Sequence, residues 1–412
     1  MQYRLIIKKI LVRIASLVFI FLILFSGIYI NKSIQHKNQK IESSRPQTPF
    51  KIETKPTKGK TITKENKLCA PNSEPIYTNP NYDYTRNDIQ KIIGYKNNKF
   101  GIYTYMEVDH FLALADLLVN SNGGEWGYVL VPYNVKDYRD DKWEAYFAKL
   151  NQLKLIPIIQ LWDLDKDNAD SQINDSAEFL NKMPWPIKNR YISVFNEVND
   201  AKFWHNEINP EYYAVILDKV ITKYKATNEN FFIINGAFNA SARTTKDTLD
   251  EEDFLIRMDR KKPGILSKLD GWASHPYPQP NFTGSPLATG RDSIKAYEWE
   301  LGILKNRFGV TNLPVFITET GWPHKEAKTD RDDYLPIKQV ASNLIYAYKN
   351  VWLPDERVVA ITPFTIWYNP PFDNFSWVDE DYKPLLQFEE IAKLDKVKGN
   401  PPHLEAIWKC KE

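Results

Sequence analysis

The chain has 412 residues, with 54 Lys and Arg against 52 Asp and Glu, and 43% of its residues are hydrophobic. The near-balanced charge argues against a basic nucleic-acid-binding protein, and the hydrophobic content excludes a wholly disordered chain. Only 2 Cys are present, too few for a disulfide scaffold or a four-Cys zinc site.

Charge is unevenly distributed along the chain. Residues 1–67 hold 14 Lys and Arg against 3 Asp and Glu, whereas the remainder holds 40 against 49. A basic leader therefore precedes an acidic body.

The leader contains an uncharged run, IASLVFIFLILFSGIYI, at residues 14–30. Its length is at the lower limit for crossing a bilayer of roughly 30 Å. A cleaved signal peptide and an uncleaved signal-anchor both fit, and the lack of a small-x-small cleavage site favours the anchor. We expect residues 1–30 to hold the protein in the membrane with its body outside the cytoplasm, or to be removed from a secreted protein.

Residues 31–80 are rich in Lys, Thr and Pro and have little hydrophobic periodicity, so we expect a disordered linker. Residues 81–412 would then form a single catalytic domain. Cys69 and Cys410 lie near the two ends of this domain. In an oxidising compartment they are expected to form one disulfide, and two unrelated thiols are the alternative.

Apolar strand-like runs alternate with amphipathic segments from about residue 98 onward. The expected strands are 100–106, 126–133, 155–162, 190–198, 231–238, 269–277, 314–322 and 358–368. The clearest expected helices are 109–120, 141–154, 210–225 and 336–352. Such alternation predicts an α/β fold with a parallel sheet.

Eight strand–helix units in this length are typical of a single (β/α)8 TIM barrel. A doubly wound open sheet is the alternative, but no Gly-rich phosphate loop follows the first expected strand.

Two glutamates stand where the fourth and seventh expected strands end. Glu197 ends the run RYISVFNEV, and Glu319 lies in PVFITETGW. A carboxylate in an apolar run is costly to bury unless its charge is compensated, and one such Glu alone would suggest an ion pair. Strand ends of a barrel meet at one face, so two carboxylates there favour a catalytic pair that cleaves glycosidic bonds.

The pattern resembles the clan A glycoside hydrolases, the retaining (β/α)8 glycosidases. The resemblance rests on Asn196-Glu197, on Glu319 within ITETGW, on HPY between them and on IWY after them. It implies that Glu197 is the acid/base and Glu319 the nucleophile. It also implies that Asn196 bonds the sugar 2-hydroxyl.

The same resemblance assigns further residues to substrate binding. Tyr277 corresponds to a Tyr that contacts the nucleophile, and Trp367 to the Trp that forms the floor of the subsite at the cleaved bond. His275 corresponds either to a substrate-contacting or supporting His or to an ordinary core residue. Trp162 and Trp322 are candidate sugar platforms, with packing as the alternative for each.

The second expected strand ends at Tyr133-Asn134 without the Arg that several families of the clan have there, which leaves the exact family open. No cofactor or metal site is indicated. The run Asp163–Asp167 lacks the Gly and terminal Glu of a calcium loop and is interpreted as a solvated loop.

The sequence therefore predicts a retaining glycoside hydrolase acting on a β-linked extracellular or cell-surface polysaccharide. Its expected partners are this carbohydrate and the membrane, with no nucleic acid. A non-catalytic carbohydrate-binding protein on a degenerate barrel and a transglycosidase are the alternatives. Sugar, linkage and endo or exo action depend on loop shape and stay open.

Overall fold

The computed structural model describes residues 75–78, 92–105 and 109–406, all of which belong to one compact unit. The expected signal-anchor at 1–30, most of the linker at 31–80, and both Cys69 and Cys410 lie outside these residues. Among the helices of the described ranges, none combines the length and apolarity needed to cross a membrane.

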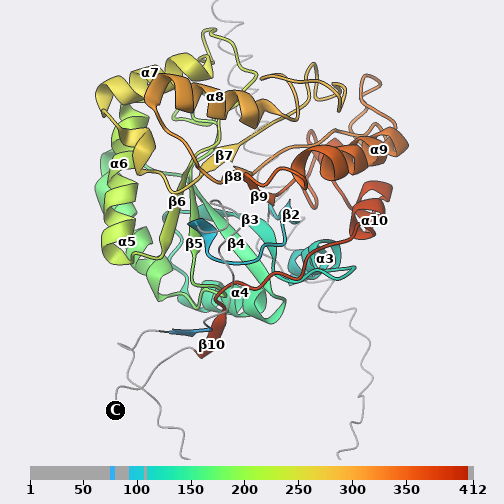
Figure 1. The fold of residues 1–412 in the computed structure, drawn as a ribbon, viewed down its shortest axis with the longest axis horizontal. Helices are drawn as coiled ribbons and strands as arrows, with labels where there is room; N and C mark the ends of the chain where they lie inside the picture. Colours follow the sequence, from blue (N-terminus) through green and yellow to red (C-terminus); the bar gives the residue numbers. More distant parts are fainter. Residues whose placement is uncertain (1–74, 79–91, 106–108, 407–412) are drawn as a thin grey trace, which may run out of the picture. The chain divides into compact units, whose positions relative to one another are not determined.

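Eight parallel strands form the centre of the structure (Figure 1). They are β2 (Gly101–Tyr103), β3 (Gly127–Asn134), β4 (Leu155–Trp162), β5 (Arg190–Val194), β6 (Phe231–Asn235), β7 (Trp272–Ser274), β8 (Val315–Ile317) and β9 (Val358–Ile361). Ladders join β2 through β6 and β7 through β9 in chain order. The parallel bridges Ile234–Gly271 and Phe100–Ile361 connect the two sheets at both edges, so the strands close into a barrel. The predicted α/β fold with a parallel sheet is confirmed.

A helix follows each barrel strand and packs outside it, as Figure 1 shows. These helices are α3 (Asp109–Val119), α4 (Asp140–Gln152), α5 (Ala169–Lys182), α6 (Pro210–Thr227), α7 (Glu251–Lys261), α8 (Ala296–Phe308), α9 (Ile337–Ala347) and α10 (Leu386–Ala392). The expected helix 336–352 is α9 followed by a π-helical turn, Tyr348–Trp352.

Six barrel strands are shorter than the sequence predicts. The expected strands 100–106, 190–198, 231–238, 269–277, 314–322 and 358–368 end at Tyr103, Val194, Asn235, Ser274, Ile317 and Ile361. The apolar run continues past each end because loop residues at the mouth are also buried, so composition alone does not mark where the ladder stops. These extra residues carry most of the predicted site.

The core has two layers. One apolar cluster lies between the strands and the helices, and a second lies inside the barrel. Inside, the hydroxyl of Tyr95 forms hydrogen bonds with those of Tyr128 at 2.8 Å and Tyr191 at 2.7 Å. Gly101 permits closure of the barrel, because a Cβ there would lie 2.6 Å from the Thr362 methyl group.

The amino ends of the barrel strands are covered by the two ends of the described chain. The short strand β1 (Ile76–Tyr77) pairs antiparallel with β10 (Leu404–Ala406). The segment before β10 also bridges Lys398 to Glu125 and His403 to Ile187. The predicted site residues lie at the opposite end of the barrel, the mouth formed by the carboxyl ends of the strands.

Candidate active site

Glu197 lies three residues past the end of β5, at the barrel mouth. The backbone reaches it through two residues with positive φ, Phe195 at 73° and Glu197 itself at 36°. Such conformations cost a non-Gly residue on the order of 1–3 kcal/mol and persist where the surroundings impose them. Here the Glu197 amide donates to the Ala237 carbonyl at 2.8 Å, which fixes the turn.

Glu319 lies two residues past the end of β8. Its side chain is 12% exposed and that of Glu197 is 13% exposed, so both are largely withdrawn from water and reachable from the mouth. The Tyr277 hydroxyl donates to Oε2 of Glu319 at 3.1 Å. The other carboxyl oxygen, Oε1, does not accept this hydrogen bond.

His275 lies between the two glutamates. Its Nδ1 is 3.1 Å from Oε1 of Glu197 and 3.8 Å from Oε2 of Glu319. These two oxygens are therefore no farther apart than the two distances combined. That limit includes the roughly 5–5.5 Å between the carboxyls of retaining glycosidases and overlaps only the lower end of the range of about 6.5–9.5 Å found in inverting ones.

The pKa values of this group depend on one another. The pKa of Glu319 is raised to about 7: burial raises it most, the charge of Glu197 also raises it, and His275 and the Tyr277 hydrogen bond lower it. Burial lowers the pKa of His275, but Glu319 and Glu197 outweigh it and the net shift is upward. The titrations of Glu319 and His275 are therefore coupled to each other.

Asn196 is positioned by a buried chain of amides. The Nε1 of Trp162 donates to Oε1 of Gln160 at 2.8 Å, and Nε2 of Gln160 donates to Oδ1 of Asn196 at 3.0 Å. With its oxygen occupied, Asn196 presents its Nδ2 group as a donor. Gln160 is fully buried. Sequence analysis missed it, although a polar residue inside the apolar strand LIPIIQLW was a detectable signal.

The other two predicted Trp residues make contacts with residues outside the pair of glutamates. Trp322 is 3% exposed, and its Nε1 donates to the Gly284 carbonyl at 2.8 Å, so it anchors the loop after β7 and presents no free face. Trp367 packs against Phe111 and Tyr382. The structure thus brings together Glu197, Glu319, Asn196, His275 and Tyr277, with Trp162 attached through Gln160.

Aromatic side chains that the sequence analysis did not select border Glu319. The Phe364 amide donates to the Thr320 carbonyl at 3.1 Å, and the Phe364 ring lies 5.2 Å from that of Tyr103. The rings of Tyr368 and Tyr105 are 4.2 Å apart. Burial raises the pKa of Tyr368, Tyr105 adds to the rise, and the charge of Glu319 makes a smaller contribution.

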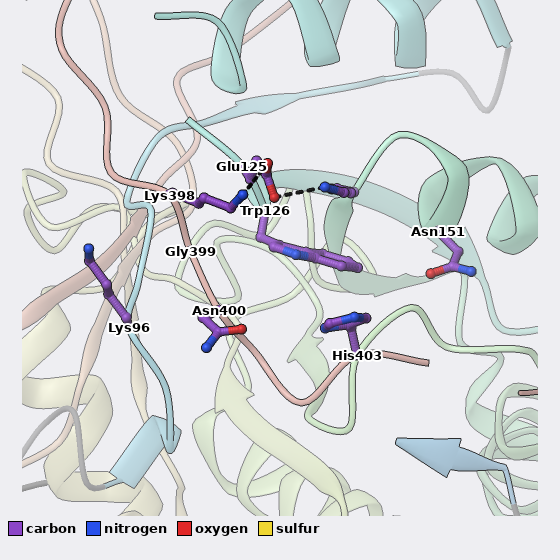
Figure 2. Close-up of a pocket in the computed structure, with 9 residues that line it drawn as sticks. Lys96, Glu125, Trp126, Asn151, Lys398, Gly399, Asn400 and His403 are labelled. Carbon is purple, nitrogen blue, oxygen red and sulfur yellow. Dashed lines mark hydrogen bonds and ion pairs between the residues drawn. The ribbon is translucent and has the colours of Figure 1, made fainter. Parts of the chain in front are cut away.

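A separate cavity of about 620 Å³ lies at the amino end of the barrel (Figure 2). Glu125 there forms ion pairs with Lys154 at 2.7 Å and Lys398 at 2.9 Å, and His403 packs on Trp126. Glu125 is the only carboxylate among the residues that line this cavity, and it is paired with two lysines, so the cavity lacks the second carboxylate that a glycosidase mechanism requires. The described residues contain no cluster of three or more potential metal ligands. The mouth is therefore the candidate active site.

No protein-family model and no curated protein matches the chain. Among solved structures, it is similar to a GH128 subgroup II endo-β-1,3-glucanase from Pseudomonas viridiflava, at 15% identity over 72% of this chain and 97% of that one, with a TM-score of 0.47. It is also similar to one of two fungal β-1,4-galactanases, at 15% identity over 69% of this chain and 90% of the galactanase, with a TM-score of 0.47. A third similar structure is the β-glucanase of Saccharophagus degradans, at 14% identity over 72% of this chain and 87% of the glucanase, with a TM-score of 0.44. These neighbours are glycoside hydrolases, and the function proposed below rests on the geometry of the site itself.

Proposed function

We propose that this protein is a retaining glycoside hydrolase of the clan A type that cleaves a β-linked polysaccharide. The observation that carries the proposal is the shared contact of Glu197 and Glu319 with Nδ1 of His275 at the barrel mouth. Two carboxyls held this close, largely out of water, are the machinery of double displacement.

In this mechanism Glu319 attacks the anomeric carbon and forms a glycosyl-enzyme. Glu197 protonates the leaving oxygen and afterwards removes a proton from the attacking water. Tyr277 orients Glu319 through Oε2, so that Oε1 is the attacking atom. The Asn196 Nδ2 group is placed to bond the sugar 2-hydroxyl, an interaction that accelerates the reaction if it strengthens in the transition state.

The substrate class is inferred from charge and aromatic content. Asp200 adds a third carboxyl near Glu197; burial raises its pKa, and the charge of Glu197 contributes to the rise. A mouth with three carboxyls repels acidic sugars. Tyr105, which is exposed, and Phe364 and Tyr368, which are half-buried, offer ring surfaces of the kind that pack on sugar C–H groups. We therefore propose a neutral glycan.

The test is a panel of activated aryl β-glycosides with wild type, Glu197→Ala and Glu319→Ala. Loss of turnover in both variants, with azide rescuing Glu319→Ala and giving an α-glycosyl azide, supports the proposal. Glu144→Ala, an exposed carboxylate on α4, is the matched control and should keep full activity. Activity unaffected by either site variant would refute the assignment. Glycan binding without turnover would indicate a binding protein, and transfer to acceptor sugars a transglycosidase.

Location outside the cytoplasm and membrane attachment are proposed from the apolar run at residues 14–30. The disulfide between Cys69 and Cys410 belongs to the same proposal. It is supported by the pairing of β1 with β10, because the sequence places Cys69 shortly before β1 and Cys410 shortly after β10. Reduction of the exported protein should add the mass of two hydrogens. Two thiols that alkylate freely before reduction would contradict the disulfide.

A further inference from the structure

The cavity at the amino end of the barrel has no part in the proposed reaction, yet its size suits a ligand (Figure 2). Its volume of about 620 Å³ lies within the range of about 300–1,000 Å³ that is typical of small-molecule sites. It forms where the segments before β2, β3 and β10 meet the end of α4 and the turn that follows this helix.

Backbone contacts hold the walls of this cavity together. The Gly399 amide donates to the Glu125 carbonyl at 3.0 Å, and the Asn400 amide donates to the Lys96 carbonyl at 2.9 Å. Gly399 permits this close approach, because a Cβ there would lie 2.9 Å from the Glu125 carbonyl oxygen. The site is therefore already formed, which reduces the ordering cost of binding a ligand.

The cavity is positively charged although the body of the protein is acidic. Its charged lining residues are three lysines and one glutamate: Lys96, Lys154, Lys398 and Glu125. Residues 68–412 as a whole hold 40 Lys and Arg against 49 Asp and Glu. Glu125 pairs with Lys154 at 2.7 Å and with Lys398 at 2.9 Å, and Lys96 has no acidic partner within the described ranges. Cations gathered in a concave site attract an anion.

Neutral polar groups complete the lining. The side-chain amides of Asn151 and Asn400 form no hydrogen bond with any described residue. The imidazole of His403 is held through Nδ1, which lies 3.1 Å from the Thr78 hydroxyl and 3.1 Å from the Pro401 carbonyl oxygen. Two amides and a fixed imidazole thus border the cavity with groups that can bond hydroxyls.

The cavity also has an aromatic wall. The His403 ring packs on the buried Trp126 ring, with centroids 5.2 Å apart and planes inclined by 33°. Figure 2 shows Asn400, His403 and Asn151 arranged around the Trp126 indole. The half-buried imidazole offers a ring surface of the kind on which sugar C–H groups pack.

This combination of groups favours an acidic sugar over a simple anion. A carboxylate on the sugar would pair with Lys96, and its hydroxyls would bond the two amides and Glu125. A bare phosphate offers almost no donors for Glu125 and the amide oxygens, whereas sugar hydroxyls both donate and accept. A neutral sugar would leave the charge of Lys96 without a partner.

We propose that this cavity is a second carbohydrate site, which binds an acidic saccharide that carries uronic-acid carboxylates. The mouth has three carboxyls and repels such sugars, so the two ends of the barrel accept glycans of different charge. The inference goes beyond the proposed hydrolysis, and binding at this site requires no turnover.

The experiment titrates the full chain with three probes and follows the NMR signal of the His403 ring, with calorimetry for affinity. The probes are a trimer of β-1,4-linked glucuronic acid, its neutral counterpart cellotriose, and inorganic phosphate. The acidic trimer should shift the His403 signal and bind at least tenfold more tightly than either other probe. Its affinity should be the same in wild type and in Glu319→Ala, because the mouth takes no part, and should fall as salt is raised.

Variants identify the groups that bind the trimer. Lys96→Ala should weaken its binding about tenfold or more, because a charge-assisted hydrogen bond is lost, and Lys96→Arg should restore most of the affinity. Asn400→Ala should weaken binding several-fold. The side chains at both positions are exposed, so we expect the fold and the turnover of an aryl β-glycoside to be unchanged. Lys305→Ala, an exposed lysine on α8, is the matched control and should bind the trimer as wild type does.

Three results would overturn the inference: no His403 shift with the acidic trimer, equal shifts with cellotriose or phosphate, or full binding by Lys96→Ala. The binding measurement is independent of hydrolysis. Binding of the trimer by a protein without hydrolase activity would support the second site and reject the proposed function. Hydrolase activity without binding at the cavity would do the reverse.

Discussion

The hydroxyl of Tyr277 donates to Oε2 of Glu319 at 3.1 Å, and this contact joins the loops after β7 and β8 at the barrel mouth. The bond stabilises the ionised form of Glu319 and lowers its pKa, against burial and the charge of Glu197. It also fixes which oxygen of the carboxylate is free. The phenol thus orients the proposed nucleophile and, together with the stronger effect of His275, favours its ionised form.

Tyr277→Phe removes this bond while it keeps the ring, which packs against Phe282 and Phe375. Hydrogen bonds to charged groups contribute about 1.5–3 kcal/mol, so we expect kcat/KM to fall roughly 10- to 100-fold. The acidic limb of the pH profile should move to higher pH, because Glu319 loses a group that lowers its pKa. A variant with an unchanged profile and unchanged kcat/KM would show that Tyr277 does not support the nucleophile.

Asn196→Ala is expected to lower kcat/KM about 100-fold on a parent aryl glycoside, because it removes the donor aimed at the 2-hydroxyl. On the matching 2-deoxy glycoside the same substitution should cost only a few-fold, since the bond is already absent. The two substrates are measured side by side with wild type and variant. Equal losses on both would mean that Asn196 acts through packing rather than through the 2-hydroxyl.

Trp367→Ala and Tyr368→Ala should separate a packing residue from a substrate-facing one. Trp367 contacts Phe111 and Tyr382, so its loss should lower the free energy of unfolding by about 2–4 kcal/mol with little change in KM. Tyr368 is half-buried and packs against the exposed ring of Tyr105, so its loss should raise KM several-fold with a smaller effect on stability. Chemical denaturation and steady-state kinetics measure both quantities. A raised KM in Trp367→Ala with little loss of stability would instead identify Trp367 as the sugar-binding ring.

Glu300 of α8 is fully buried, so the stability of Glu300→Gln relative to wild type should depend on pH. The pKa of Glu300 rises from 4.5 to about 7 on folding, so the folded state binds its proton more tightly. This contribution is fully present below pH 4.5 and is lost as pH rises through about 7. The side chain of Glu300→Gln stays neutral throughout. The free energy of unfolding of the variant minus that of wild type should therefore increase by roughly 1–3 kcal/mol between pH 5 and pH 8. Glu144→Gln, which is exposed, should show no such trend.

Much of the fold could be predicted because each barrel strand is buried on both faces and reads as a continuous apolar run. The same property hid the strand ends. FNEV after Val194 and TETGW after Ile317 are mostly buried although the ladder has stopped, and their Phe, Val, Thr and Trp residues are of the types that strands favour. The turn at Glu197 depends on positive φ angles at non-Gly residues, which composition does not reveal.

The site was partly predictable for a related reason. Glu197, Glu319, His275 and Tyr277 are polar residues directly after apolar strands, and topology brings strand ends together. The cavity at the amino end could not be found this way, because its lining residues are far apart in the sequence and their meeting is known only once the chain has folded. At the last barrel strand, the packing of Trp367 against Phe111 of α3 is likewise known only once the chain has folded.

The most direct test of the central claim is the stereochemistry of the first product. Hydrolysis of an aryl β-glycoside by wild type is followed by proton NMR before mutarotation. If Glu319 forms a glycosyl-enzyme, and Glu197 then deprotonates the water that hydrolyses it, the first sugar released is the β anomer. Release of the α anomer would show a single displacement and would contradict the assignment of Glu319 as the nucleophile.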